Sequence, residues 1–89
     1  MVTLQEIIDF SEIERGQLEA IAELEHIPEV VAAELAHELI STPHGIYQLH
    51  NMFLEAIEQA EYAGSRSKVR RIEAQYRSFA RRFPKPRVL

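Results

Sequence analysis

The chain contains no cysteine, and its 89 residues include only 3 glycines and 4 prolines. The absence of cysteine excludes a disulfide framework, a zinc–cysteine site and thiol catalysis. Few residues interrupt regular structure, and 46% are hydrophobic, so the composition favours one ordered helical domain with a thin core over a disordered chain.

Long apolar runs are also absent. No run approaches the roughly 18 residues of a membrane span, and the N-terminus lacks the basic-then-apolar pattern of a signal peptide. We therefore expect a soluble, cytoplasmic protein without a membrane partner. The sequence has no glycine-rich phosphate loop and no nucleophile elbow, and its carboxylates are spread over helix surfaces. These features predict a protein that is not an enzyme, with no catalytic residue, no cofactor and no bound metal.

Basic residues are scarce in the first 64 residues, and acidic residues are scarce in the last 25. The first 64 residues hold 13 of the 14 acids but only one basic residue, Arg15, which gives a formal net charge of −12. The last 25 residues hold the other nine lysines and arginines and one acid, Glu73, which gives +8. This asymmetry is the most informative feature of the sequence, because it predicts two surfaces of opposite charge.

The apolar residues recur at spacings of three and four, which is typical of helices and not of strands. Thr3 with Glu6, or Ser11 with Glu14, forms a capping box at the start of the helical part. The first long helix then runs to about Glu25.

Prolines and a capping threonine mark the next two helices. Pro28 ends the first helix and suits the first turn of the second, which runs to about Ile40. Thr42 caps the third helix, with Pro43 at its first position, and this helix runs to about Ala63.

The chain then turns back on itself. Gly64 suits a left-handed stop, Ser65 or Ser67 caps the fourth helix, and Phe83 ends it. The third and fourth helices are each about 30 Å long and joined by a tight link, so they form an antiparallel hairpin. The predicted fold is all-α: a small bundle of about four helices, with two shorter N-terminal helices packed on a long antiparallel hairpin. Residues 1–83 form the single domain, and 84–89 an exposed C-terminal tail.

Each hairpin helix carries an apolar stripe that we expect in the core. The third helix contributes Ile46, Leu49, Phe53, Ala56, Ile57 and Ala60. The fourth contributes Val69, Ile72, Tyr76, Phe79, Ala80 and Phe83. Met52 and Leu54 flank the third-helix stripe on opposite sides, so this helix is either central or has a partner in trans. His50, at the edge of the same stripe, is predicted to be half-buried against a neighbour.

Two Glu-x-x-His pairs, Glu23/His26 and Glu34/His37, have the spacing with which di-iron bundles hold metal. Such ligands must point into the bundle. The predicted apolar sides comprise Phe10, Leu18, Ile21 and Ala22 in the first helix and Val31, Ala32, Leu35 and Leu39 in the second. At about 100° per residue both pairs project nearly opposite these sides. We expect solvated faces; the alternative is a metal that bridges two subunits.

Residues 31–53, VAAELAHELISTPHGIYQLHNMF, locally resemble the helix-turn-helix DNA-binding motif. The positions that match are Ala33, Leu35, Ala36 and Leu39 in the first helix, Ser41 and Thr42 in the turn, and Ile46 and Leu49 as buried anchors. The resemblance implies a recognition helix whose His44, Tyr47, Gln48 and Asn51 would touch base edges. The usual turn glycine is Ile40 here, and the recognition helix has no lysine or arginine. Its acidic surroundings do not supply the phosphate neutralisation that dominates nucleic-acid affinity.

Arg70, Arg77 and Arg81 fall on one line of the fourth helix, opposite its aromatic stripe. This basic line either binds nucleic acid or meets the acidic half of the chain, in cis or in a partner subunit. The nearly equal opposite charges favour the second interpretation.

The sequence thus predicts a non-enzymatic interaction or accessory protein that self-associates as a homo-oligomer and engages protein partners. The alternative is a nucleic-acid-binding regulator that uses the degenerate helix-turn-helix or the basic C-terminal helix. A subunit-bridged metal site ranks third.

Overall fold

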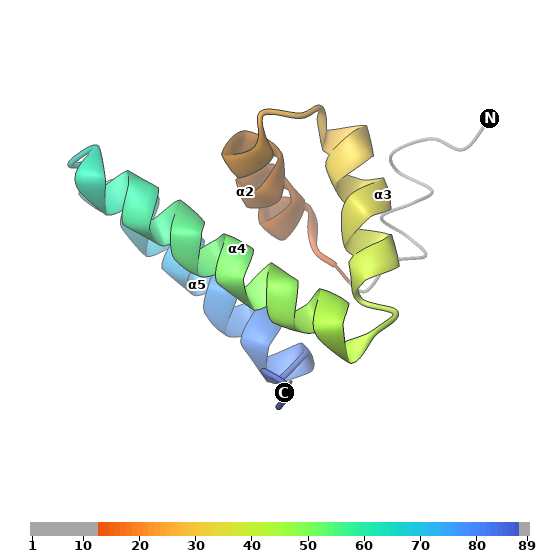
Figure 1. Cartoon of the computed structure of the whole chain (residues 1–89). Helices are drawn as coiled ribbons and strands as arrows, with labels where there is room; N and C mark the ends of the chain where they lie inside the picture. The colour runs from red at the N-terminus through yellow and green to blue at the C-terminus, as the bar shows by residue number, and fades with distance from the viewer. Residues whose placement is uncertain (1–12, 88–89) are drawn as a thin grey trace.

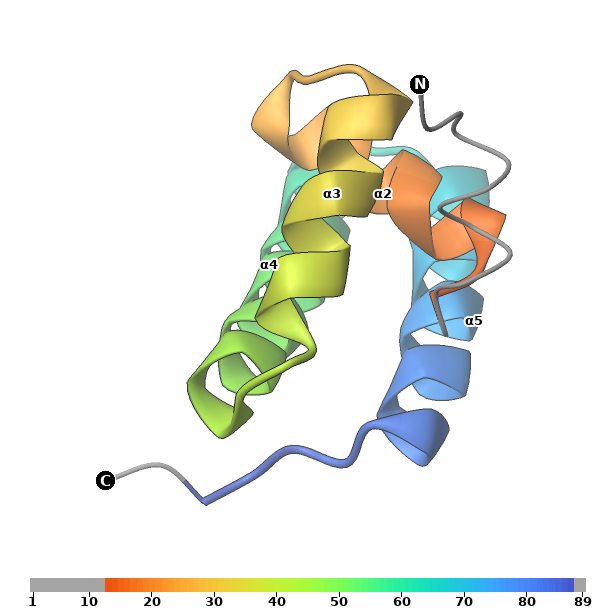
Figure 2. The same cartoon turned by 90° about the vertical axis from the view of Figure 1, so that its right-hand side faces the viewer.

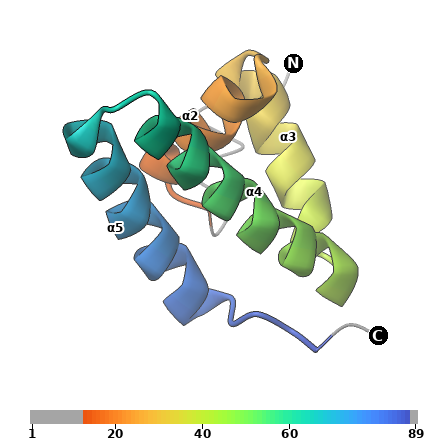
Figure 3. The same ribbon diagram turned by 60° about the vertical axis from the view of Figure 1, so that its left-hand side comes forward.

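The computed structural model describes residues 13–87, which form four helices and no strand (Figure 1). The helices are α2 (Arg15–Glu25), α3 (Glu29–Leu39), α4 (Pro43–Tyr62) and α5 (Arg66–Arg82). Helices α4 and α5 lie side by side as an antiparallel hairpin (Figure 3). Helix α2 packs against both hairpin helices, and α3 packs against α2 and α4 (Figure 2). The predicted fold class, two shorter helices on a long hairpin, is confirmed.

Local sequence signals set the ends of the hairpin helices. The Thr42 hydroxyl accepts a hydrogen bond from the Gly45 N–H at 2.9 Å, and Pro43 is the first residue of α4. Gly64 adopts φ +77°, a left-handed conformation that glycine reaches without steric cost. The Ser65 hydroxyl caps α5 by accepting from the Lys68 N–H at 3.4 Å. The Thr42 cap and the left-handed Gly64 are confirmed, and of the two serines predicted as alternatives Ser65 is the cap of α5.

The start of α2 lies elsewhere than predicted. Thr3, Glu6 and Ser11 are outside the described residues, and α2 begins at Arg15 with Glu14 as its N-cap. The Glu14 N–H donates to the Gln17 side-chain carbonyl at 3.0 Å. The capping pair in the described chain is therefore Glu14 with Gln17, three residues further on than the predicted Ser11 with Glu14.

Helix α2 ends at Glu25, as predicted, but the role predicted for Pro28 differs. Helix α2 ends at Glu25 because His26 adopts a left-handed conformation, φ 56°, and the Ile27 N–H donates back to the Ala22 carbonyl at 3.0 Å. Pro28 is the N-cap of α3, with extended backbone, and not a residue of its first turn. The helix ends through its own backbone hydrogen bonds before proline can end it.

The core lies where α2 and the hairpin meet. Its largest fully buried apolar side chains are Ile13, Leu18, Ile21, Leu49, Phe53 and Phe79. Phe53 and Phe79 pack with ring centroids 5.0 Å apart, which joins the two predicted stripes across the hairpin. Ala56, Ala60 and Ile72 extend the stripes under α2. The apolar positions predicted for both hairpin helices are buried or half-buried, as their spacing indicated.

The buried side of α3 is rotated from the predicted one: Ala32 is buried and Leu35 and Leu39 are half-buried, as expected, but Val31 is not. Ala32, Ala33 and Ala36 are at most 1% exposed, whereas Val31 is 42% exposed. Three alanines allow α3 to approach its neighbours closely, so the helix turns its small residues inward. Val31, assigned to the apolar side by hydrophobicity alone, is left at the surface.

Candidate functional site

The Glu-x-x-His pairs do not converge. Glu34 and His37 are exposed on α3, where they border a shallow surface hollow with Glu38 and Ser41. His26 is exposed at the left-handed end of α2. Within residues 13–87, no group of three or more His, Asp or Glu side chains is placed to hold one metal ion. A metal site that bridges two subunits stays a prediction.

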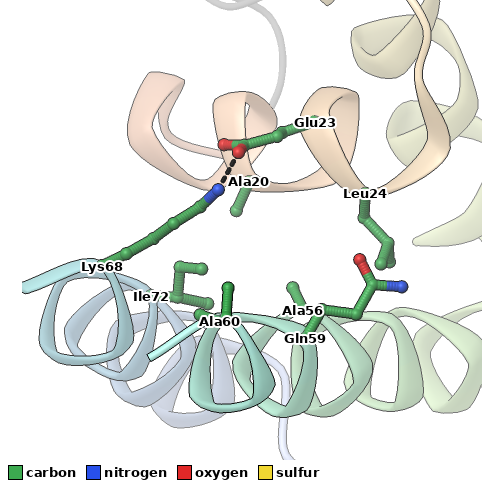
Figure 4. Close-up of a pocket in the computed structure, with 9 residues that line it drawn as sticks. Ala20, Glu23, Leu24, Ala56, Gln59, Ala60, Lys68 and Ile72 are labelled. Carbon is green, nitrogen blue, oxygen red and sulfur yellow. Dashed lines mark hydrogen bonds and ion pairs between the residues drawn. The ribbon is translucent and has the colours of Figure 1, made fainter. Parts of the chain in front are cut away.

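Glu23 has an electrostatic partner instead. Its carboxylate forms an ion pair with the Lys68 ammonium, which connects the acidic α2 to the basic α5 (Figure 4). Beneath this pair lies a cavity of about 200 Å³, lined by Ala20, Leu24, Ala56, Gln59, Ala60, Ala63 and Ile72. This volume is below the roughly 300–1,000 Å³ typical of small-molecule sites. The geometry indicates a gap between packed helices and not a ligand pocket.

The second helix of the helix-turn-helix segment exposes polar side chains but no lysine or arginine of its own. Helix α4 presents His44, Gln48 and Asn51 to solvent, while Tyr47 is half-buried and the Lys85 ammonium lies 5.1 Å from its ring centroid. Ile40, at the position of the usual glycine, has ordinary right-handed backbone, φ −69°, so the turn does not need glycine there. The side chains of α4 include groups that could hydrogen-bond to base edges. However, α4 has no lysine or arginine to neutralise phosphates.

The turn into α4 depends on a different glycine, Gly45. It is buried, and a Cβ at this position would overlap the Leu39 backbone carbonyl. The chain therefore passes close to the end of α3 at the start of α4.

Arg70, Arg77 and Arg81 are all exposed on α5, on the side opposite its buried Ile72 and Phe79. None of the three forms an ion pair with a carboxylate of residues 13–87. The basic line that the sequence indicated is thus presented to solvent. Within this part of the chain it does not meet the acidic half in cis.

An acidic surface lies beside this basic line. Helix α2 contacts the hairpin through one side, where Ala56 and Ala60 of α4 and Lys68 and Ile72 of α5 face it. On the side turned away from α2, α4 presents Leu54, Glu58 and Glu61, and α5 presents Arg66, Val69, Arg70, Glu73 and Arg77. We call these eight residues the outer hairpin face. Glu61, Arg66, Val69, Arg70 and Glu73 border one open hollow between the helices.

His50 is fully buried, 1% exposed, and so the prediction of a half-buried histidine was wrong. Its Nε2 donates to the Phe83 carbonyl, 2.6 Å away, and its Nδ1 accepts from the Tyr76 hydroxyl, 2.9 Å away. Both bonds are satisfied by the neutral imidazole with its proton on Nε2. Burial lowers the pKa of His50, and the nearby Lys85 lowers it further, against the opposing effect of the bond to Phe83.

The sequence contained a signal for this burial. His50 follows Ile46 by four residues and precedes Phe53 by three, so it has the spacing of the core stripe. The hydrogen bonds tie the middle of α4 to the end of α5. With both ring nitrogens occupied, His50 has a structural task at the open end of the hairpin.

The chain matches no protein-family model, no curated protein and no solved structure. Over residues 13–87, no helix combines the length and apolar character needed to cross a bilayer. What the fold defines is a small all-α bundle, and its most distinctive surface is the outer hairpin face, with acidic and basic helices side by side.

Proposed function

We propose that this is a cytoplasmic, non-enzymatic interaction protein that associates with itself, steered by surfaces of opposite charge. The observation that carries the proposal is the exposed state of these charges. The ion pair from Glu23 to Lys68 joins the two halves, yet Arg70, Arg77 and Arg81 pair with no carboxylate of residues 13–87. Charges that find no opposite partner among residues 13–87 are available to a second molecule.

Exposed apolar side chains support association as well. Val30 and Val31 are 36% and 42% exposed on α3, Leu54 is 42% exposed on α4, and Tyr62 is 96% exposed at the end of α4. A small domain buries a limited share of its apolar surface on folding. Contact between copies would cover some of the remainder, with charge setting which surfaces meet.

The test is the mass of the purified chain by multi-angle light scattering, at tens of micromolar and at low and high salt. We expect an assembly larger than the monomer at low salt and partial dissociation at about 0.5 M salt, where charges on exposed surfaces are strongly screened. A monomer under both conditions would contradict self-association.

The exposed arginine line also favours a second candidate, nucleic-acid binding through α5. Fluorescence anisotropy with labelled duplex and single-stranded oligonucleotides separates the two functions. Under the first proposal, binding at 0.15 M salt is no tighter than millimolar. Submicromolar binding would establish the second candidate, provided that its log–log salt slope falls when Arg70, Arg77 and Arg81 are all replaced by glutamine. Each phosphate neutralised contributes roughly one unit to that slope.

A further inference from the structure

The outer hairpin face has an order to its charges. Its α4 edge carries Glu58 and Glu61, and its α5 edge carries Arg66, Arg70 and Arg77. All five side chains are exposed, and none pairs with an opposite charge among residues 13–87. Helices α4 and α5 lie side by side (Figure 3). An acidic edge on α4 therefore adjoins a mainly basic edge on α5, which also carries the half-buried Glu73.

The charged residues also lie at matching heights along the hairpin. Glu61 borders the same hollow as Arg66 and Arg70, near the link between the helices. Further along, Phe53 packs against Tyr76, with ring centroids 5.8 Å apart, which sets the middle of α4 level with the middle of α5. Leu54 thus lies level with the stretch of α5 that carries Glu73 and Arg77.

We propose that two copies pack through their outer hairpin faces, related by a twofold axis parallel to the hairpin helices. This inference rests on the proposed self-association and specifies its surface and partner. Rotation about this axis does not move a residue along the helix direction, but it places α4 of the second copy over α5 of the first. Helix α4 of one copy then lies antiparallel on α5 of the other, and the two hairpins form a four-helix arrangement.

The charge pattern selects this axis over the alternative. In the proposed dimer, Glu58 and Glu61 of one copy lie over Arg66 and Arg70 of its partner, and the same contact occurs twice by symmetry. A twofold axis perpendicular to the helices would stack α4 on α4 and α5 on α5. That arrangement brings acid against acid and arginine against arginine, which opposes association.

Apolar contact accompanies the charged pairs. Leu54, 42% exposed, would come over the α5 segment of the partner between Glu73 and Arg77, where the aliphatic stems of these side chains can cover it. The half-buried Val69 and Ala80 lie along the same edge of α5. At the end of the hairpin away from the α4–α5 link, the Lys85 ammonium already lies over the Tyr47 ring. The contact therefore centres on the half of the hairpin next to that link.

Reciprocal charge reversal tests the proposal. One variant carries Glu58→Lys with Glu61→Lys, and a second carries Arg66→Glu with Arg70→Glu. Each places like charges across both copies of the contact, so each alone is expected to raise the dimer Kd at least tenfold in analytical ultracentrifugation. Mixed in equal amounts, the two variants place opposite charges at both contacts, and the heterodimer should return to within about threefold of the wild-type Kd.

A matched control reverses two exposed acids away from this face, Glu34→Lys with Glu38→Lys on α3. It changes net charge by the same amount as the α4 variant and should leave Kd within about twofold. Far-UV circular dichroism and the melting temperature verify that every variant is folded. Suppose that the wild type dimerises. If the α4 and α5 variants then dimerise as tightly as the wild type, or if their mixture stays monomeric, the proposed interface is wrong although self-association is supported. If the wild type is a monomer, the proposed function itself fails.

The absence of native cysteine provides an independent measurement. Glu61→Cys and Arg70→Cys, made in separate chains, are mixed under mild oxidation. In the proposed dimer the two positions face each other across the interface, so the mixed disulfide should exceed both same-variant disulfides several-fold. A statistical mixture of the three products, or an excess of either same-variant product, would contradict the twofold axis parallel to the helices.

Discussion

The α4/α5 hairpin and helix α3 are packed in different ways. Large aromatic side chains, led by Phe53 and Phe79, join the hairpin helices. Helix α3 is instead buried through Ala32, Ala33 and Ala36. Large side chains fill the space between helices and contribute most of the apolar area, whereas small ones let backbones approach. The hairpin should therefore be sensitive to lost volume, and the packing of α3 against its neighbours to added volume.

The largest expected effect comes from lost volume in the hairpin. Phe79 is 1% exposed, and Phe79→Ala removes a ring that packs against Phe53, His50 and Phe83, so it should lower the free energy of unfolding by about 3–5 kcal/mol. Urea denaturation followed by circular dichroism measures the loss. Leu54→Ala, at an exposed site in the same hairpin, is the control and should cost less than about 1 kcal/mol in the monomer. Similar losses for the two variants would contradict this account of the core.

Added volume at the start of α4 should have the next largest effect. Gly45→Ala places a methyl group where the Leu39 backbone carbonyl lies, so α3 and α4 must separate; overpacking of this kind costs about 1–3 kcal/mol. Gly64→Ala is the matched comparison, because its Cβ meets no atom within 4 Å and its cost comes from φ +77° alone, about 1 kcal/mol. Thermal and urea unfolding of both variants would rank them. If Gly64→Ala proved the more destabilising, close approach would not be what limits the α3–α4 turn.

The smallest expected effect is the pH dependence contributed by His50. Its folded pKa is lowered by burial, so the folded state binds its proton less readily than the unfolded chain, whose histidine pKa is about 6.5. The stability from neutral His50 is present above that unfolded pKa. It is lost as pH falls below about 6.5, with a slope of at most about 1.4 kcal/mol per pH unit for one proton.

In the described part of the chain, the groups recorded against His50 are the Tyr76 hydroxyl, the Phe79 ring, the Phe83 carbonyl and the Lys85 ammonium. None of these four groups offers a negative charge to an imidazolium. His50→Gln should therefore flatten the dependence of the unfolding free energy on pH between pH 5 and 7, after an overall loss of stability at neutral pH. Urea titrations at several pH values measure both quantities. An unchanged slope in the variant would assign the pH dependence to other groups.

Helix ends were predictable where a single residue controls them. Thr42, Pro43 and Gly64 act through backbone restrictions or a short hydrogen bond, and each has the role predicted for it. For α5 the sequence left two serines open, and the structure selects Ser65. Pro28 shows the limit of this reasoning, because α2 had already ended through the left-handed His26. Whether a helix continues up to a proline depends on the backbone hydrogen bonds before it, and these depend on how the helix packs.

The candidate surface was only half predictable. Arg70, Arg77 and Arg81 were found from periodicity, since residues opposite an aromatic stripe on one helix must face away from its core. Their acidic neighbours Glu58 and Glu61 were not singled out, because the sequence does not state which face of α4 remains uncovered by α2. Within residues 13–87, the basic helix meets the acidic half in cis through the ion pair of Lys68 with Glu23, and not through this arginine line.

Sequence alone determined the helical class, the caps of the hairpin helices and their aromatic stripes, because each follows from interactions within a few residues of chain. It also determined the separation of charge along the chain. Tertiary structure decided which side of α3 is buried, that His50 is enclosed with both nitrogens bonded, and which charges remain exposed beside one another. These outcomes depend on how closely helices distant in sequence approach, and that distance is set by the volumes of the side chains between them.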